Sequence, residues 1–118
     1  MADMGGHRPA AEPEDLNRFF LERARAGDVE GVVALYEPAA VLAFPPGEIT
    51  AGHEALRRVY EELLADPPPF AGEVRPALRA GDLALTSNRF QGGATAEVAR
   101  RQPDGSWLWV ADQPNVLG

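Results

Sequence analysis

Glu97 is the residue best suited to acid–base chemistry, because the expected strand pairing sets it among polar and aromatic neighbours. A two-residue turn at Gly92-Gly93 places Asn88 directly opposite Glu97, with Thr86 near them on the same face. A carboxylate that loses hydration among aromatic rings has a raised pKa and can act as a general base or acid. The alternative is structural: Glu97 pairs with Asn88 or with Arg101 and only stabilises the sheet.

Five aromatic residues are candidates for contact with a ligand. They are Phe20, Tyr36, Phe44, Trp107 and Trp109. Tyr36 ends an apolar helical stripe, so its hydroxyl either donates a hydrogen bond to a ligand carbonyl or belongs to the core. Trp107 and Trp109 lie two residues apart in one expected strand, where they either stack on a planar ligand or fill the core.

A second charged set lies on the other face of the expected sheet, where Asp112 can meet Arg89 or Arg100. The plainest interpretation is an ion pair at the sheet rim or at a subunit interface. His53 opens an expected helix and is predicted to lie at the surface. His7 is the only other histidine and cysteine is absent, so we expect no metal site. Without a glycine-rich nucleotide motif we also expect no cofactor.

The elements that must position these side chains follow from hydrophobic periodicity. Residues 1–13 have no such period and are expected to form a disordered leader before one domain, 14–118. Apolar residues at helical spacing then predict helices at about 14–26, 28–37 and 52–65. Beyond Pro67-Pro68-Pro69 the period falls to two, which indicates an antiparallel meander. The expected strands are 40–44, 73–80, 82–91, 94–102 and 106–115.

The turns of this meander fix which side chains share a face of the sheet. One face is expected to hold Thr86, Asn88, Phe90, Thr95, Glu97, Arg101, Trp107, Trp109 and Gln113. The other is expected to hold Leu83, Leu85, Ser87, Arg89, Val98, Arg100, Leu108, Val110 and Asp112. A one-residue bulge would exchange the later residues between the faces. Because the helices cover only the first face, the apolar residues of the second predict a homodimer through the sheet.

Composition excludes several classes of function. The chain has 118 residues, no lysine among its 11 basic residues, and a formal net charge of −7, so no basic stripe is present to bind nucleic acid. Basic residues that are all arginine are typical of a high-GC bacterial genome. No apolar run is long enough for a membrane helix and the first residues lack a signal core, so we expect a cytoplasmic protein.

At several points the chain resembles the SnoaL-like, nuclear transport factor 2-like superfamily. The resemblance covers about residues 14–115 and includes the order helix, helix, strand, helix, meander. The residues that carry it are Ala26-Gly27-Asp28, Gly52-His53-Glu54-Ala55-Leu56, the run from Arg100 to Trp107, and Asp112-Gln113-Pro114. The closing residues look like those of small bacterial ketosteroid isomerase-like members of unassigned function. The resemblance implies a cone-shaped α+β barrel in which a curved sheet wraps the helices around a pocket.

The superfamily's steroid isomerases use a tyrosine in the first helix and an aspartate just before a proline at the end of the first strand. The matching positions here hold Phe20 and Phe44, and Phe44 directly precedes Pro45. Neither ring can move a proton or stabilise an oxyanion, so the chain is not expected to be a true ketosteroid isomerase. The superfamily's epoxide hydrolases activate water with carboxylates and an arginine, which Asp112 and a neighbouring arginine would resemble.

The sequence therefore predicts a pocket protein for an apolar cyclic compound, polyketide-like or steroid-like, that acts by acid–base chemistry without a cofactor. The alternative is a non-catalytic binding or accessory protein on the same fold. Glu97 is the expected catalytic residue. The other expected ligand contacts are Phe20, Tyr36, Phe44, Thr86, Asn88, Trp107 and Trp109. If the assignment of faces is right, Asn88 and Glu97 border a cavity while Arg89 and Arg100 point away from it.

Overall fold

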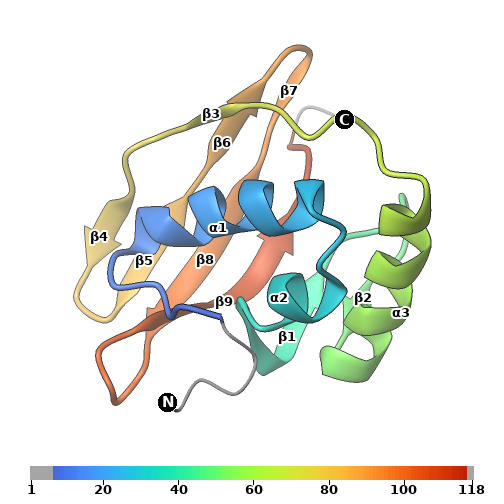
Figure 1. Cartoon of the computed structure of the whole chain (residues 1–118). Coiled ribbons are helices and arrows are strands. Elements are labelled where there is room, and N and C mark those ends of the chain that lie inside the picture. The colour runs from blue at the N-terminus through green and yellow to red at the C-terminus, as the bar shows by residue number, and fades with distance from the viewer. Residues whose placement is uncertain (1–6, 117–118) are drawn as a thin grey trace.

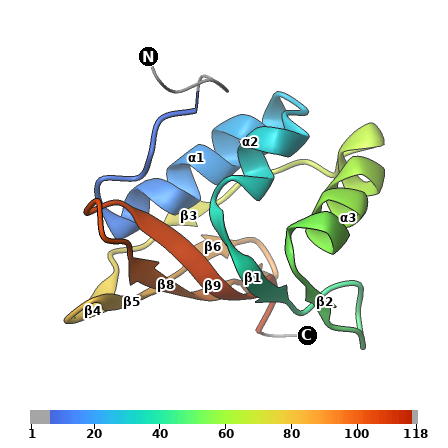
Figure 2. The same cartoon turned by 90° about the horizontal axis from the view of Figure 1, so that it is seen from below.

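The computed structural model describes residues 7–116, and these form three helices that all lie on one face of a curved sheet (Figures 1 and 2). The helices are α1 (Pro13–Arg25), α2 (Val29–Val33) and α3 (His53–Ala65). The strands are β1 (Tyr36–Leu42), β2 (Thr50–Ala51), β3 (Glu73–Val74), β4 (Leu78–Ala80), β5 (Leu83–Thr86), β6 (Asn88–Phe90), β7 (Gly93–Ala94), β8 (Ala96–Arg101) and β9 (Trp107–Gln113). This is the α+β architecture that the sequence predicts. Within the described part of the chain, no helix is long and apolar enough to cross a membrane.

The main sheet has the strand order β2-β1-β9-β8-β5-β4, and a smaller sheet has the order β3-β6-β7. Neighbouring strands are antiparallel except β1 and β9, which run parallel. In Figure 1, α1 lies across β5, β8 and β9, while α3 lies beside the β1 end of the sheet. The helices and the inner face of the sheet therefore bound the interior of the fold.

Helix α1 begins and ends where its local sequence requires. Pro13 occupies the first turn, and Glu12 and Asp15 form a capping box that satisfies free backbone N–H groups at the start. Leu16 and Ala24 are fully buried on the face that packs against the sheet. Gly27 follows with a φ of 70°, which suits glycine and stops the helix.

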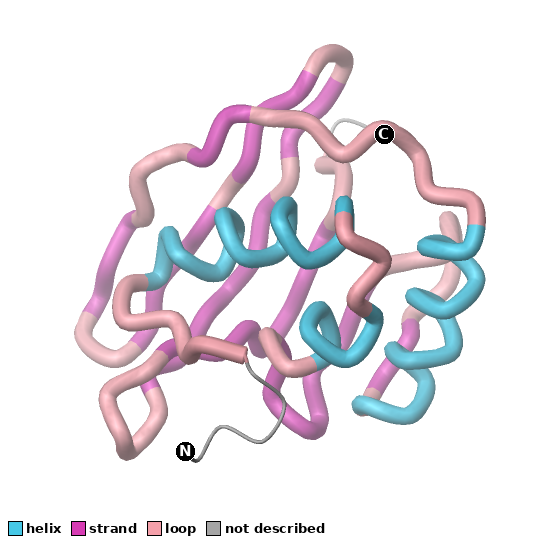
Figure 3. The backbone as a smooth tube through the Cα atoms, viewed as in Figure 1, coloured by secondary structure: helices cyan, strands magenta, loops and turns pink. Residues whose placement is uncertain are grey.

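The hairpin from β5 to β8 forms with its faces as predicted but with a different register. Gly92 takes a φ of 86° in the turn, and Phe90 pairs with Gly93, whereas the expected turn pairs Gln91 with Ala94. Thr86 therefore lies opposite Glu97, the position that the sequence assigns to Asn88. The partner changes by two residues, and because side chains alternate with a period of two, each keeps its face. The hairpin continues through short breaks in both strands (Figure 3).

A one-residue bulge in β9 changes the later face assignments. Ala99 pairs with Trp109, but Val98 pairs with Ala111, so Val110 is an extra residue in β9. From that point Asp112 faces inward and is buried, while Gln113 is exposed. The predicted positions of Asp112 on the outer face and Gln113 on the inner face are both wrong, and the bulge is the reason.

The second helix is shorter than the predicted 28–37. Helix α2 ends at Val33, and Tyr36 is the first residue of β1 rather than the last of a helix. Trp109 donates its backbone N–H to the carbonyl of Leu35 at 2.8 Å, and Tyr36 pairs with Trp109. The helical spacing of the apolar residues is outweighed here by pairing with β9, a tertiary interaction that local propensity does not contain.

Residues 7–12 pack onto the domain, which corrects the disordered leader expected for 1–13. Ala10 is buried and forms an antiparallel bridge with Trp107, whose backbone N–H donates to the carbonyl of Ala10 at 2.9 Å. Arg23 donates a hydrogen bond to the carbonyl of Arg8 at 2.8 Å. Residues 1–6 lie outside the described residues.

Ala10 and Ala11 provide a matched test of this packing. We expect Ala10→Asp to lower the free energy of unfolding by about 1–3 kcal/mol, because it buries an unpaired charge beside Trp107 or detaches the segment. Ala11→Asp places the same charge on an exposed residue and should change the value by less than about 0.5 kcal/mol. Urea unfolding followed by tryptophan fluorescence measures both, and equal values for the two variants would contradict the packing.

Candidate functional site

A cavity of about 530 Å³ lies between the helices and the inner face of the sheet, within the range of ordinary ligand pockets. Its apolar wall includes rings from helix, strand and loop segments: Phe20, Phe44, Phe70, Phe90 and Trp109. Its polar groups are Asn17, Tyr60, Asn88, Gln91, Thr95, Glu97 and Asp112. The cavity is thus a mainly apolar space with a small set of polar groups.

Two carboxylates lie side by side in this cavity. Glu97 on β8 and Asp112 on β9 are direct partners across the antiparallel pair, and both side chains face inward. Glu97 is 3% exposed and Asp112 is 9% exposed. Directly opposed residues in antiparallel strands have Cβ atoms only about 4.5–5.5 Å apart, so the two charges interact strongly. We call these two residues the carboxyl pair.

Glu97 is held by hydrogen bonds that fix the role of one of its oxygens. Trp109 donates from Nε1 to Thr86 Oγ1 at 3.1 Å, and Thr86 donates onward to Glu97 Oε1 at 2.6 Å. Asn17 on α1 also donates from Nδ2 to Oε1, at 3.1 Å. Since Oε1 accepts two hydrogen bonds, a proton on Glu97 must sit on the other oxygen.

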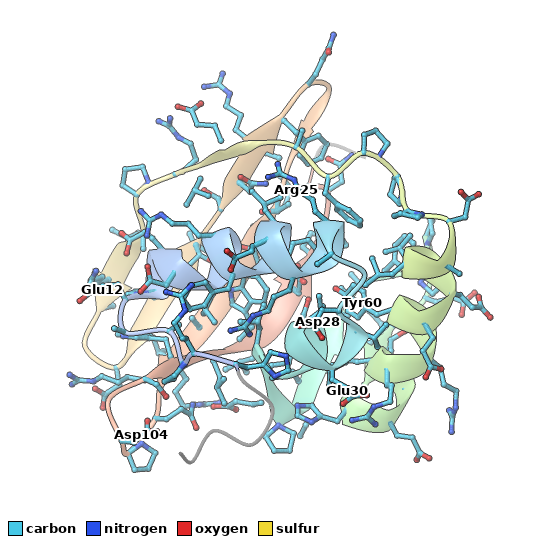
Figure 4. All side chains as sticks on the ribbon, viewed as in Figure 1. Glu12, Arg25, Asp28, Glu30, Tyr60 and Asp104 are labelled. Atoms are coloured by element: carbon cyan, nitrogen blue, oxygen red, sulfur yellow. The ribbon has the colours of Figure 1, made fainter. Side chains whose placement is uncertain are left out.

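Asp112 is bonded to a pair of tyrosines. Tyr36 donates its hydroxyl hydrogen to Asp112 Oδ2 at 2.5 Å, and the Tyr36 and Tyr60 hydroxyl oxygens are 2.7 Å apart. With the Tyr36 hydrogen directed to Asp112, Tyr60 is the donor to Tyr36. Tyr60 comes from the side of α3 that faces the other helices (Figure 4), and of the two tyrosines it is the one that lines the cavity.

Burial raises the pKa of both members of the carboxyl pair. The pKa of Asp112 is raised to about 7, first by burial and then by the negative charge of Glu97, against a smaller lowering by the Tyr36 hydrogen bond. Burial also raises the pKa of Glu97, while hydrogen bonds from Thr86, Thr95 and Asn17 oppose the rise. Burial raises the pKa of Tyr36 and Tyr60, so both stay protonated. Near neutral pH the carboxyl pair can therefore hold or release a proton.

The predicted site residues fall into three groups. Phe20, Phe44, Asn88, Glu97 and Trp109 line the cavity. Tyr36 and Thr86 lie behind the lining and reach it through hydrogen bonds to the two carboxylates. Trp107 is buried at the bridge with Ala10 and is not part of the cavity wall, because the N-terminal segment covers it.

The charged contacts expected on the outer face form differently. Arg100 donates to Glu37 at 2.8 Å, so the expected pairing of Arg100 with Asp112 is wrong. Arg101 pairs with Asp82 at 2.6 Å and is exposed, so it does not hold Glu97. Arg89 and Arg100 are exposed and outside the cavity lining, which is the orientation expected for them.

Five polar residues of the cavity are missing from the predicted contacts: Asn17, Tyr60, Gln91, Thr95 and Asp112. Asn17 interrupts an apolar stripe three residues before Phe20, which is a signal that a polar group faces the interior. Tyr60 is predicted only as part of an apolar helix face, because its spacing does not show where its hydroxyl goes. Asp112 would be found only by locating the bulge. His53, expected at the surface, is half-buried and donates from Nε2 to the Tyr36 carbonyl at 2.7 Å.

The segment between α3 and β3 closes one side of the cavity. Phe70 contacts Phe20 edge to face with ring centroids 5.7 Å apart, and Arg25 donates to the Phe70 carbonyl at 2.8 Å (Figure 4). A Cβ atom on Gly72 would lie 2.4 Å from Asn88 Nδ2, so only glycine allows this close approach. Among residues 7–116, no group of three or more histidine, aspartate or glutamate side chains could hold a metal ion.

Comparison with known proteins gives the same fold. A ketosteroid isomerase-like protein from Erwinia carotovora atroseptica matches with a TM-score of 0.72 and 20% identity, over 85% of this chain and 89% of that chain. A nuclear transport factor 2-like protein of unknown function from Pseudomonas putida matches with a TM-score of 0.67 and 21% identity, over 84% and 80%. A third, with a cystatin-like fold, comes from Novosphingobium aromaticivorans, with a TM-score of 0.65, 22% identity, and 85% and 76% coverage.

At these sequence identities the structural matches establish the fold of this chain but do not indicate its activity. No curated protein matches the chain. The family model of the SnoaL-like domain matches residues 16–113, which include every strand and helix described above except the first three residues of α1. The chain therefore belongs to the SnoaL-like family and has a nuclear transport factor 2-like fold.

Proposed function

We propose that the protein binds an apolar cyclic compound, polyketide-like or steroid-like, and transforms it by proton transfer without a cofactor. The observation that supports this most is the carboxyl pair, two buried acids that face a cavity with aromatic walls. A general acid or base works best when its pKa lies near the working pH, and burial moves both groups in that direction. The aromatic wall of the cavity supplies apolar contact for the rings of such a compound.

Glu97 is the proposed proton-transfer residue. Thr86 and Asn17 both donate to its Oε1, which orients the carboxylate, and the second oxygen is the one proposed to exchange a proton with the substrate. Asp112 is the proposed partner, and its own pKa is raised first by burial and then by the negative charge of Glu97. Preorganised hydrogen bonds of this kind reduce the reorganisation needed during reaction.

Tyr60 is the proposed polar contact for a substrate oxygen. While Asp112 is ionised, Tyr60 donates to Tyr36, and its own oxygen can accept a hydrogen bond. When Asp112 is protonated on Oδ2, it can donate to Tyr36, and Tyr36 can then donate to Tyr60. The Tyr60 hydrogen is then free to reach a ligand carbonyl. Protonation at Asp112 would thereby turn Tyr60 from an acceptor into a donor.

The proposed chemistry differs from that of the steroid isomerases that the sequence resembles. Phe20 and Phe44 stand where those enzymes place their tyrosine and aspartate, and both rings line the cavity. The acids here come instead from β8 and β9. A non-catalytic role on the same fold remains the second candidate, because Thr86, Asn17 and Tyr36 already satisfy the carboxyl pair without a ligand.

Hydrogen exchange into a ketone tests catalysis. A base that removes a proton from the carbon beside a carbonyl forms an enolate, and return of a deuteron from the exchanged carboxyl leaves labelled ketone. We expect the protein to speed this exchange in 2-tetralone, an apolar bicyclic ketone, in D₂O. Glu97→Gln should reduce the catalysed rate by about 100-fold or more, because it keeps the shape and removes the titrating group.

Glu62→Gln is the matched control. Glu62 is exposed on α3, so this substitution makes the same chemical change away from the cavity. Nuclear magnetic resonance follows the loss of the α-proton signal, and circular dichroism checks that each variant is folded. Equal rates for the wild type and Glu97→Gln would remove Glu97 from catalysis and favour the non-catalytic candidate.

We also propose that the protein forms a homodimer through the outer face of the sheet. Leu83, Leu85 and Val98 are 44%, 46% and 37% exposed there, and neighbouring Leu108 and Val110 are half-buried. In the described residues all helices lie on the opposite face (Figure 2). A second copy placed on this face would remove these leucine and valine side chains from water.

Light scattering at micromolar concentration measures this assembly. We expect about twice the chain mass of 12.7 kDa for the wild type. Leu85→Arg puts a charge in the centre of the proposed interface and should give the mass of one chain. Ala65→Arg, at the exposed end of α3, is the control and should stay dimeric. A wild-type mass of one chain would refute the interface.

A further inference from the structure

The charged side chains that line the cavity are all acidic. Its lining includes Glu97 and Asp112, and none of the described residues that line it is an arginine or a histidine. The chain contains no lysine, and its formal net charge is −7. Tyr36 contributes a hydroxyl to Asp112 but no positive charge. A negatively charged ligand would meet two carboxylates here with no counter-charge, so the lining disfavours anions.

Two amide oxygens at the cavity also lack a partner. Asn17 and Asn88 line the cavity, are only 3% and 7% exposed, and each has a buried Oδ1 without a hydrogen bond in the described structure. The Asn17 amide is oriented by its Nδ2, which donates to Glu97, so its free atom is an acceptor. Buried acceptors without a donor are rare in folded proteins, and a bound donor would satisfy them.

The aromatic wall suits a positive charge as well as an apolar body. Phe20 contacts both Phe70 and Trp109, with ring centroids 5.7 Å and 6.1 Å away, so three rings gather on one side of the cavity. The faces of aromatic rings carry partial negative charge and attract cations, and tryptophan does so most strongly. Acceptor oxygens and ring faces therefore favour the same kind of head group.

We propose that the ligand carries a protonated amine, which binds at Glu97 and Asp112 while its apolar cyclic body lies against the aromatic wall. This names the ligand class for the cavity and rests on the proposed binding function. An ammonium group has three hydrogen-bond donors and no acceptor, which matches carboxylate and amide oxygens. It also relieves the repulsion between the two carboxylates, because each gains a positive partner.

Three probes with one naphthalene body test the head group. They are 2-naphthylmethylamine, which is an ammonium ion at neutral pH, 2-naphthylmethanol, which is neutral, and 2-naphthoate, which is an anion. Isothermal titration at about pH 7.5 should rank the amine about tenfold or more above the alcohol, with naphthoate weakest. An amine that binds no tighter than the alcohol overturns the proposal.

Variants assign the preference to the carboxyl pair rather than to the acidic surface. Asp112→Asn should remove most of the advantage of the amine over the alcohol. Glu97→Gln is the second variant if Asp112→Asn does not fold. Asp66→Asn, an exposed acid at the end of α3, is the control and should keep the preference. A preference that survives both cavity variants would also overturn the proposal.

The results separate this inference from the function on which it rests. If the alcohol binds and the amine binds no tighter, the proposal of an apolar binding cavity stands and only the proposal of an amine ligand is refuted. If none of the three probes binds, both the proposal of an amine ligand and the proposed binding of apolar cyclic compounds are refuted.

Discussion

The site depends on one irregularity, the extra residue Val110 in β9. Before the bulge Trp109 faces the cavity, and after it Asp112 faces the cavity in place of Gln113. Without that shift Glu97 would be the sole acid of the lining, and its neighbour on β9 would be an amide. The bulge thus creates the carboxyl pair, and the electrostatic properties of the cavity follow from two acids held on adjacent strands.

Two helices and two strands contribute side chains that hold the carboxyl pair. Asn17 from α1 and Thr86 from β5 bond Glu97, while Tyr36 from β1 bonds Asp112. Tyr60 from α3 completes the chain of hydroxyls. Because these donors come from four elements, the packing of the helices onto the sheet and the orientation of the acids are coupled. Disturbing α1 or α3 should therefore change the chemistry of the cavity as well as the stability of the fold.

Periodicity predicts the helices α1 and α3, the change to strands, and the inward faces of Thr86, Asn88 and Glu97, because these depend on local patterns. It does not predict the parallel pairing of Tyr36 with Trp109, which ends the second helix early. Partners of this kind lie far apart in the sequence and contribute energies that local spacing does not contain.

The candidate site divides in the same way. Five of the expected contacts line the cavity, since face and burial follow from alternation. Asp112 depends on the bulge, and Trp107 depends on coverage by Ala10, a contact between distant segments. The place of Tyr60 in the site depends on the direction in which its hydroxyl points. Such details come from three-dimensional packing and have no signature in the spacing of residues.

The carboxyl pair is tested most directly by measuring how its own protons titrate. Carbon-13 nuclear magnetic resonance of labelled aspartate and glutamate side chains, with Asp112→Asn and Glu97→Gln to assign the signals, gives both pKa values. The account predicts that the pKa of Asp112 is about 7 and falls in Glu97→Gln, because the negative charge of Glu97 is removed. Titration of both groups at the ordinary values of about 4, as in solvated carboxylates, would contradict it.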